Sequence, residues 1–301
     1  MTTATNTAAS IINAPGKIKQ SKSLWQHAIS SILRDKLACT ALIVVAVYFL
    51  IALLTFMGVL ASNWGAEIGP AYAPPSADFF FGTDIFGRSV FLKTIKGAET
   101  AIAIGLATSM ISLIIGTLMG AIAGYFGGLI DEVIVWFYTT FSSIPFIMLL
   151  ISIAFIMGKG TSTVFISLGV TSWVSLCRIV RGEVMKHKER EYSQAANALG
   201  AGHTRKIFKH ILPNISHVLI INFSLTFESA IKAEVILSYL GLGVQGRPSW
   251  GTMIDDSKLE LARGVWWQLG AATLAMFFIV LAFNILGDAL RDALDPKLKG
   301  K

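Results

Sequence analysis

Long uninterrupted apolar segments dominate the pattern of hydrophobic and polar positions along the chain. A helix needs about 20 consecutive apolar residues to cross the hydrocarbon core of a bilayer. The pattern predicts an all-α, polytopic membrane protein with six such helices. They are expected at residues 37–60, within 100–130, and at 133–158, 161–177, 218–240 and 265–287. The composition agrees, because only 14% of the residues are charged, whereas soluble domains carry about 25%.

Two of these segments contain residues that disturb a plain apolar helix. Pro145 lies inside the third and is expected to kink it. The fifth contains Glu228, Lys232 and Glu234. Charged residues in a span are costly and usually face a cavity or each other, and Glu228 and Lys232 are four residues apart, so one helix face can pair them. The three charges therefore either contact a solute along a translocation path or make a structural salt bridge or partner contact.

The formal net charge of +7 and its distribution indicate an orientation. Lys and Arg gather in the N-terminal stretch and between residues 178 and 209, and such residues favour the cytoplasmic side. We expect a multi-pass protein with cytoplasmic tails at 1–36 and 297–301, an external connection at 61–99, and a core domain at 100–296. Asp131 and Glu132 lie in a short cytoplasmic turn against this trend, but acidic residues contribute little to it. The basic residues flank apolar runs, which favours contact with membrane lipid over nucleic acid.

The connection at residues 189–213 carries the most informative local pattern. A small-residue apolar face recurs at spacings of three and four, formed by Tyr192, Ala195, Ala196 and Leu199. Gly200 is placed to end this short helix, and Pro213 opens the next segment. The pattern predicts a cytoplasmic helix-turn-helix that another protein could approach closely. The alternative is an ordinary basic connection lying along the lipid headgroups.

This connection resembles the EAA loop of ABC importer permeases. The matching positions are Ala195, Ala196, Gly200, Leu212 and Pro213, while Gln194 stands where the family usually has Glu. The resemblance implies that the helix from Tyr192 to Gly200 couples the chain to a cytoplasmic ATPase. Gln194 lacks the charge of Glu but keeps an acceptor, so we expect docking to survive.

Three further blocks resemble the dipeptide, oligopeptide and nickel branch of these permeases, in particular its C-type subunit. They lie at 81–90 (FGTDIFGRSV, with Ser89 in place of the usual Asp), at 237–253 and at 281–296. The resemblance implies a type I importer permease (MetI-like) architecture in a prokaryotic inner membrane. It also implies a homologous second permease, two cytoplasmic ATP-binding subunits and an external solute-binding protein. Di- or oligopeptides are the expected substrates, with glutathione, chelated nickel and some sugars left open.

The chain contains no GxxxxGKS/T phosphate-binding loop and no GxSxG or HExxH arrangement. We therefore expect a transport subunit without an ATPase site, a cofactor or a metal site of its own, in which the partner ATPase subunits use ATP and Mg²⁺. The main alternative is a secondary transporter with Glu228, Lys232 and Glu234 as an ion relay. A membrane enzyme is disfavoured by the missing catalytic motifs, and a receptor or scaffold would not need these charges.

Overall fold

The computed structural model describes residues 30, 32–158 and 160–294. Within those ranges the regular structure is helical, apart from two isolated β-bridges. The helices are α2 Lys36–Phe56, α3 Val90–Phe126, α4 Gly128–Ser143, α5 Phe146–Met157, α6 Thr161–Lys188, α7 Glu191–Ala198, α8 His203–Arg205, the π-helix η1 Lys206–Ile211, α9 Leu212–Asn214, α10 Ser216–Tyr239, α11 Trp250–Leu261 and α12 Trp267–Leu294. Most of the predicted tail at 1–36 and all of the tail at 297–301 lie outside the described residues.

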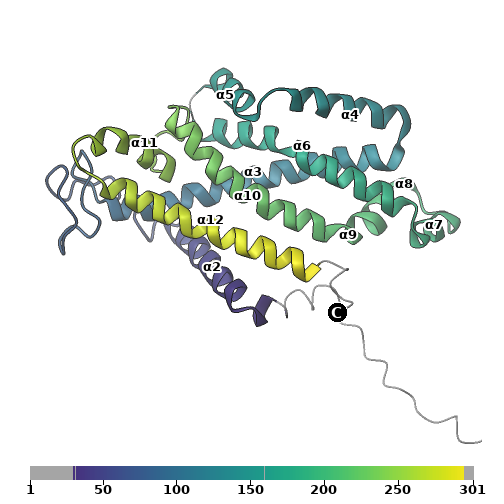
Figure 1. Ribbon diagram of the computed structural model, residues 1–301, viewed down its shortest axis with the longest axis horizontal. Helices are drawn as coiled ribbons and strands as arrows, with labels where there is room; N and C mark the ends of the chain where they lie inside the picture. Colours follow the sequence, from purple (N-terminus) through teal and green to yellow (C-terminus); the bar gives the residue numbers. More distant parts are fainter. Residues whose placement is uncertain (1–29, 31, 159, 295–301) are drawn as a thin grey trace, which may run out of the picture.

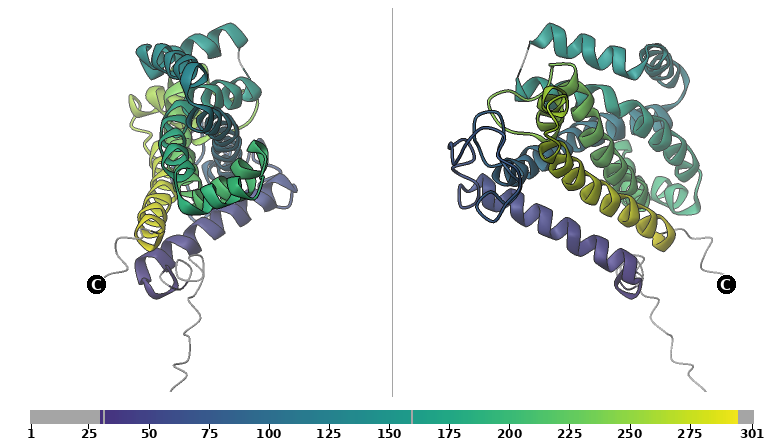
Figure 2. Two further views of the ribbon diagram at one scale, coloured as in Figure 1. Left: turned by 90° about the vertical axis from the view of Figure 1, so that its right-hand side faces the viewer. Right: turned by 60° about the vertical axis from the view of Figure 1, so that its left-hand side comes forward.

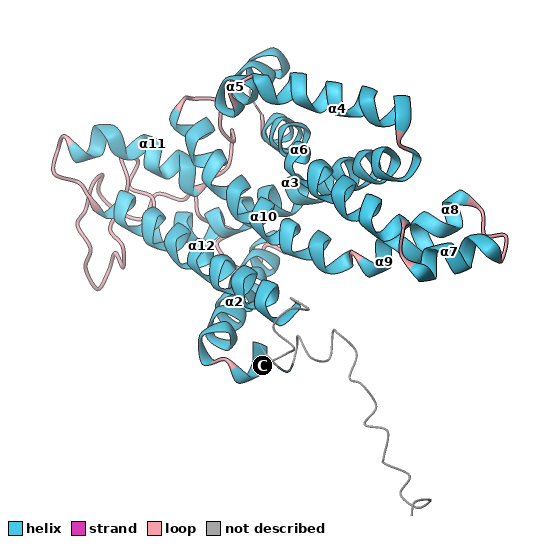
Figure 3. Ribbon diagram, turned by 45° about the vertical axis from the view of Figure 1, so that its right-hand side comes forward, coloured by secondary structure: helices cyan, strands magenta, loops and turns pink. Residues whose placement is uncertain are grey.

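The centre of the fold is the pair α3 and α6, which run side by side (Figures 1 and 3). Gly116, Gly120 and Gly124 of α3 lie one turn apart and face α6. A Cβ added at Gly120 would lie 2.6 Å from the carbonyl oxygen of Cys177. Glycines at this spacing let two helix backbones approach closely inside a membrane. The backbones of the two helices are therefore in close contact along these glycines, called the α3–α6 seam below, and this contact was not predicted from the sequence.

The remaining long helices surround this pair. The rings of Phe227 in α10 and Phe283 in α12 stack with centroids 4.1 Å apart. The hydroxyl of Tyr48 in α2 donates a hydrogen bond to the carbonyl oxygen of Ala275 in α12, at 2.8 Å. Figure 2 shows α2 (purple) against α12 and α3, and α4 and α5 on another side of the molecule. Most of α2 keeps an exposed apolar surface, as expected for a helix at the edge of a membrane protein.

Within the described residues, four helices have the length and composition of a membrane span: α2, α3, α6 and α12. The pair α4 and α5 makes a fifth if it counts as one broken span, because its halves bend by 89° at Ile144 and Pro145. The predicted kink at Pro145 is thus confirmed, and the bend is sharp. The remaining expected span, at 218–240, corresponds to α10, which has 24 residues, but Glu228, Lys232 and Glu234 lower its apolar character.

Several boundaries differ from the prediction. Helix α3 begins at Val90 rather than near residue 100, so the irregular connection that was expected to be external ends at Ser89, whose hydroxyl caps the helix. Charged residues are tolerated in its first turns because they are paired, as Lys96 is with Glu99 at 2.5 Å. Helix α6 extends past residue 177 to Lys188. The predicted external connection after α10 contains α11, which starts with a capping box at Ser249.

Candidate coupling site and polar interior

The connection at residues 189–213, called the coupling loop below, projects from one end of the molecule (Figure 3). Helix α7 ends at Ala198, and Gly200 follows in the left-handed region at φ +77°. The N–H of Gly200 donates to the carbonyl oxygen of Asn197 and that of Ala201 to Ala196, both at 3.0 Å. These bonds satisfy carbonyl groups at the helix end. The predicted short helix and its glycine terminus are confirmed.

The predicted single apolar face of α7 is divided into two sides. Ala196 is buried and Tyr192 half-buried, whereas Gln194, Ala195 and Leu199 are exposed. Leu199 is 89% exposed. Tyr192 and Ala196 are four residues apart, as are Ala195 and Leu199, and each pair follows its own line along the helix. One side therefore packs on this chain, and the other leaves small and apolar groups uncovered.

Three hydrogen bonds hold the inner side of the coupling loop. Nδ1 of His187, at the end of α6, lies 2.7 Å from the Tyr192 hydroxyl. The hydroxyl of Tyr125, at the end of α3, lies 2.9 Å from Nδ1 of His203. Within the loop, Nζ of Lys206 donates to Oδ1 of Asn197 at 2.8 Å. The loop is therefore fixed to the ends of both central helices. Sequence spacing gave no signal for the Tyr125 contact, because its partner lies 78 residues away.

The other expected coupling residues lie where the loop returns to the membrane helices. Leu212 packs against a buried apolar cluster that includes Ile207 and Ile211. Pro213 is exposed within the short helix α9. Nearby, the carboxylate of Asp131 in α4 pairs with the guanidinium of Arg181 in α6 through contacts of 2.5 and 2.6 Å. This pair explains an acidic residue at the end of a span where positive residues were expected.

Two of the three charges in α10 are brought together. Oε1 of Glu228 accepts hydrogen bonds from Nζ of Lys232 at 2.6 Å and from Nδ2 of Asn284 in α12 at 2.8 Å. The Glu228 side chain is buried, while that of Lys232 is 51% exposed. The predicted pairing on one helix face is confirmed, and Asn284 extends it to a neighbouring helix. A buried carboxylate is expected to need such donors.

Glu234 belongs to a separate group. Its Oε1 accepts hydrogen bonds from the hydroxyls of Ser238 at 2.6 Å and Ser249 at 2.7 Å. Ser249 also caps α11, so the buried Glu234 fastens α10 to the start of that helix. The three residues expected along a path therefore form two groups rather than a line.

A neutral cavity of about 380 Å³ lies between α6 and α10, beside the start of α5. Its lining combines apolar side chains, from Phe146, Leu176 and Leu225, with hydroxyl and amide side chains, from Thr171, Ser172, Ser175, Asn222, Thr226 and Ser229. Such groups both donate and accept hydrogen bonds. The cavity can therefore contact a polar solute without selecting its charge. Isolated hydroxyl residues form no distinctive sequence pattern, so this lining was not predicted from the sequence.

Comparison with known proteins gives relatives along most of the chain. The family described as "Binding-protein-dependent transport system inner membrane component" matches residues 116–300. The oligopeptide transport system permease protein OppC of Bacillus subtilis (strain 168) is 38% identical over 285 residues, which cover 93% of this chain and 92% of the relative. The dipeptide transport system permease protein DppC of the same strain is 37% identical, with 93% and 88% covered. The glutathione transport system permease protein GsiD of Pectobacterium atrosepticum is 35% identical, with 75% of each chain covered.

The fold also has a counterpart among solved structures. An inward-facing structure of the MetNI methionine ABC transporter aligns with a TM-score of 0.55 at 18% sequence identity. The alignment covers 67% of this chain and 96% of the matched chain. At this identity the likeness concerns the fold, and it agrees with the expected type I permease architecture. Together with the family match and the relatives, it establishes that the chain belongs to the family of binding-protein-dependent transport system inner membrane components.

Proposed function

We propose that this chain is one of two permease subunits of an ATP-driven importer that carries di- or oligopeptides across the cytoplasmic membrane. A homologous permease would complete the path, two ATP-binding subunits would bind on the cytoplasmic side, and an external solute-binding protein would deliver the peptide. ATP and Mg²⁺ would be used by the ATP-binding subunits, since this chain has no phosphate-binding loop. The orientation that suits these partners has both termini in the cytoplasm.

The observation that carries the proposal is the construction of the coupling loop. Its outer side exposes Gln194, Ala195 and Leu199, which supports docking against another protein. Its inner side is bonded to Tyr125 of α3 and His187 of α6. A force on the outer side would therefore reach the two central helices through short contacts. A connection that simply lies along the lipid headgroups would not need both an exposed outer side of small and apolar groups and an inner side bonded to two helices.

The mechanism follows from these contacts. ATP binding would draw the ATP-binding subunits together and move the two coupling loops with them. A ligand can shift a conformational equilibrium only through its different affinity for the two states, so ATP would favour the outward-facing state by stabilising the closed ATPase pair. Because α3 and α6 are joined along Gly116, Gly120 and Gly124, we expect them to move as one unit. Hydrolysis would reset the transporter.

The neutral cavity between α6 and α10 is the part of this chain that best fits a peptide path. Its hydroxyl and amide groups can bond to peptide backbone groups, which every peptide shares. The ion-relay alternative has less support, because Glu234 bonds to Ser238 and Ser249 instead of joining Glu228 and Lys232.

Co-purification tests the proposal. The tagged chain would be isolated from native membranes in mild detergent, and its partners identified by mass spectrometry. We expect a second permease and one or two ATP-binding proteins. Recovery of the chain alone or as a homomer, under conditions that preserve known complexes, would contradict the proposal. The secondary transporter would then become the better hypothesis, with uptake that survives ATP depletion and stops when the proton gradient is removed.

A further inference from the structure

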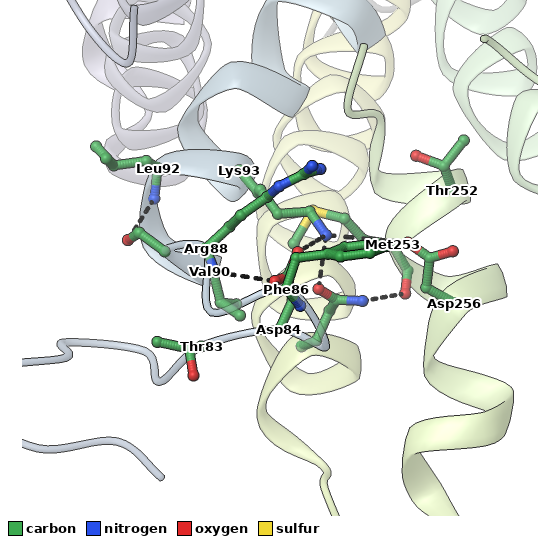
Figure 4. A network of polar contacts seen from close by, with 12 residues as sticks. Thr83, Asp84, Phe86, Arg88, Val90, Leu92, Lys93, Thr252, Met253 and Asp256 are labelled. Carbon is green, nitrogen blue, oxygen red and sulfur yellow. Dashed lines mark hydrogen bonds and ion pairs between the residues drawn. The ribbon is translucent and has the colours of Figure 1, made fainter. Parts of the chain in front are cut away.

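The segment at residues 81–90 builds a locked loop on the side of the fold opposite the coupling loop (Figures 1 and 4). The hydroxyl of Thr83 donates to the carbonyl oxygen of Pro70 at 2.6 Å. Oδ1 of Asp84 accepts the backbone N–H groups of Phe86 and Arg88, each at 2.9 Å. Gly87 has φ +69°, and a Cβ there would meet the carbonyl oxygen of Gly69. The motif is therefore a rigid turn that sets the direction of the side chains it carries.

A buried ion pair fastens this turn to the helices behind it. Nζ of Lys93 in α3 lies 2.9 Å from Oδ2 of Asp84 and donates to Oε1 of Gln268 in α12 at 2.9 Å. Asp256 of α11 lies 3.9 Å from the same nitrogen (Figure 4). Lys93 and Asp84 are thus occupied with each other. Neither is a free charge for a ligand.

A cavity of about 280 Å³ opens between this turn and α11, and two ionisable side chains in its lining, Arg88 and Glu260, each have a buried polar atom with no hydrogen-bond partner in the described chain. Among the described residues, Arg88 forms no ion pair, and its buried Nε has no hydrogen-bond partner. Its guanidinium is held over the ring of Phe86, 4.6 Å from the centroid. Glu260 is 2% exposed, and its buried Oε2 also has no partner within the described chain. Buried polar atoms without partners are rare and call for an explanation.

We propose that this pocket binds a small zwitterion, either a free amino acid or a short peptide, through its two charged ends. The ligand carboxylate would meet Arg88, because a guanidinium matches a carboxylate with paired hydrogen bonds. The ligand ammonium would meet Glu260, with Asp256 beside it in the lining. The cavity is at the small end of the range for ligand sites, which suits one or two small residues. The aromatic rings of Tyr72 and Phe86 supply apolar walls.

Two further observations agree with a binding role. Burial raises the pKa of the Glu260 carboxyl to about 7, against the opposing effect of Lys93, and Asp256 and Asp84 raise it further. An ammonium ion would favour the charged carboxylate there. Tyr72 has φ 56°, a backbone conformation that is uncommon for a bulky residue and is found mainly at functional sites and tight turns.

The inference rests on the proposed function only for the placement of the pocket outside the cell. Its test needs neither ATP nor a partner subunit, so it can fail while the importer function holds, and the reverse is also possible.

The test is calorimetric titration of the full chain in lipid nanodiscs with alanyl-alanine, N-acetyl-alanyl-alanine and alanyl-alanine amide. We expect saturable binding of the free dipeptide, and about tenfold to a hundredfold weaker binding when either end is blocked, since each block removes a charge-assisted contact. Arg88→Gln should weaken binding and abolish the effect of amidation. Glu260→Gln should weaken binding and abolish the effect of acetylation. Asp255→Asn, a neighbouring acidic residue paired with Lys258 outside the pocket, should bind like the wild type.

Three outcomes would overturn the proposal. The first is no saturable heat with the free dipeptide. The second is equal affinity for the free and blocked peptides in the wild-type chain, a comparison that needs no variant and so cannot be confused with misfolding. The third is a correctly folded Arg88→Gln variant that still discriminates against the amide.

Discussion

The two ends of α3 are held in different ways. Near its N-terminus, Lys93 forms a buried ion pair with Asp84, with side chains 8% and 2% exposed. Near its C-terminus, Tyr125 contacts His203 of the coupling loop through one hydrogen bond at 2.9 Å. With 37 residues at 1.5 Å each, the helix keeps these ends about 55 Å apart. One helix thus joins a charged anchor at one end to a loop held by hydrogen bonds at the other.

The contacts at the two ends of α3 differ in how much free energy their loss would cost. Removing one partner of a buried ion pair leaves an unpaired charge and is strongly destabilising. A typical intramolecular hydrogen bond contributes only about 0.5–1.5 kcal/mol. We therefore interpret the N-terminal end as the fixed reference of the helix. The coupling-loop end can change its contacts at modest cost, which would suit the coupling role proposed above.

The largest effect is expected at the charged anchor. Lys93→Met should lower the free energy of unfolding by about 3–5 kcal/mol, because Asp84 would remain buried without a counter-ion. Lys186→Met is the matched control, since Lys186 is 57% exposed and pairs with Glu183 at 3.3 Å. An exposed pair contributes less than about 1 kcal/mol. Thermal unfolding in detergent compares the two variants. Equal losses would mean that the anchor is no stronger than a surface pair.

Measuring stability against pH tests the buried charge near the N-terminal end of α3. The pKa of Glu260 is raised to about 7 in the folded protein from an ordinary value of 4.5. Between these two pH values the folded state holds a proton that the unfolded state releases, so the stability of the wild type falls as pH rises toward 7. Glu260→Gln lacks this titration. Relative to the wild type, we expect the variant to become more stable by about 3 kcal/mol between pH 4.5 and pH 8. A constant difference across that range would contradict the raised pKa.

The α3–α6 seam links the two ends and can be tested with two alanine variants. Gly120→Ala should destabilise the protein by about 1–3 kcal/mol, because the new Cβ would lie 2.6 Å from the carbonyl oxygen of Cys177. Gly182 lies in the partner helix α6, but no atom would lie within 4 Å of its new Cβ. Gly182→Ala should therefore leave stability unchanged or raise it, by up to about 1 kcal/mol. Unfolding midpoints that shift in the same direction would count against close packing of the two helices.

Local patterns in the sequence predicted local structure well. The end of α7 at Gly200, the break at Pro145 and the pairing of Glu228 with Lys232 each depend on neighbours within a few residues. Conformational preference and helical spacing determine such features. The sequence could therefore locate the coupling loop, although it did not predict which side of α7 is buried and which is exposed.

Contacts between segments far apart in the sequence could not be predicted from these local patterns. Tyr125 meets His203, and Glu234 meets Ser249 instead of the nearby Lys232. The resemblance at residues 81–90 identified a motif, but its role became visible only when Asp84 was found beside Lys93 and next to the pocket of Arg88. Helix packing decides these partners, and a single sequence does not encode them in its spacing.

The most direct test of the coupling role is peptide uptake by reconstituted transporter carrying Gly200→Leu or Gly264→Leu. Both glycines have positive φ, +77° and +80°, and both have open space around the added Cβ. The two substitutions should cause similar backbone strain, but only Gly200 lies in the coupling loop. We predict that Gly200→Leu abolishes ATP-driven uptake while the protein remains in the membrane, and that Gly264→Leu transports normally. Normal uptake with intact ATPase coupling in Gly200→Leu, or equal loss in both variants, would contradict the coupling role.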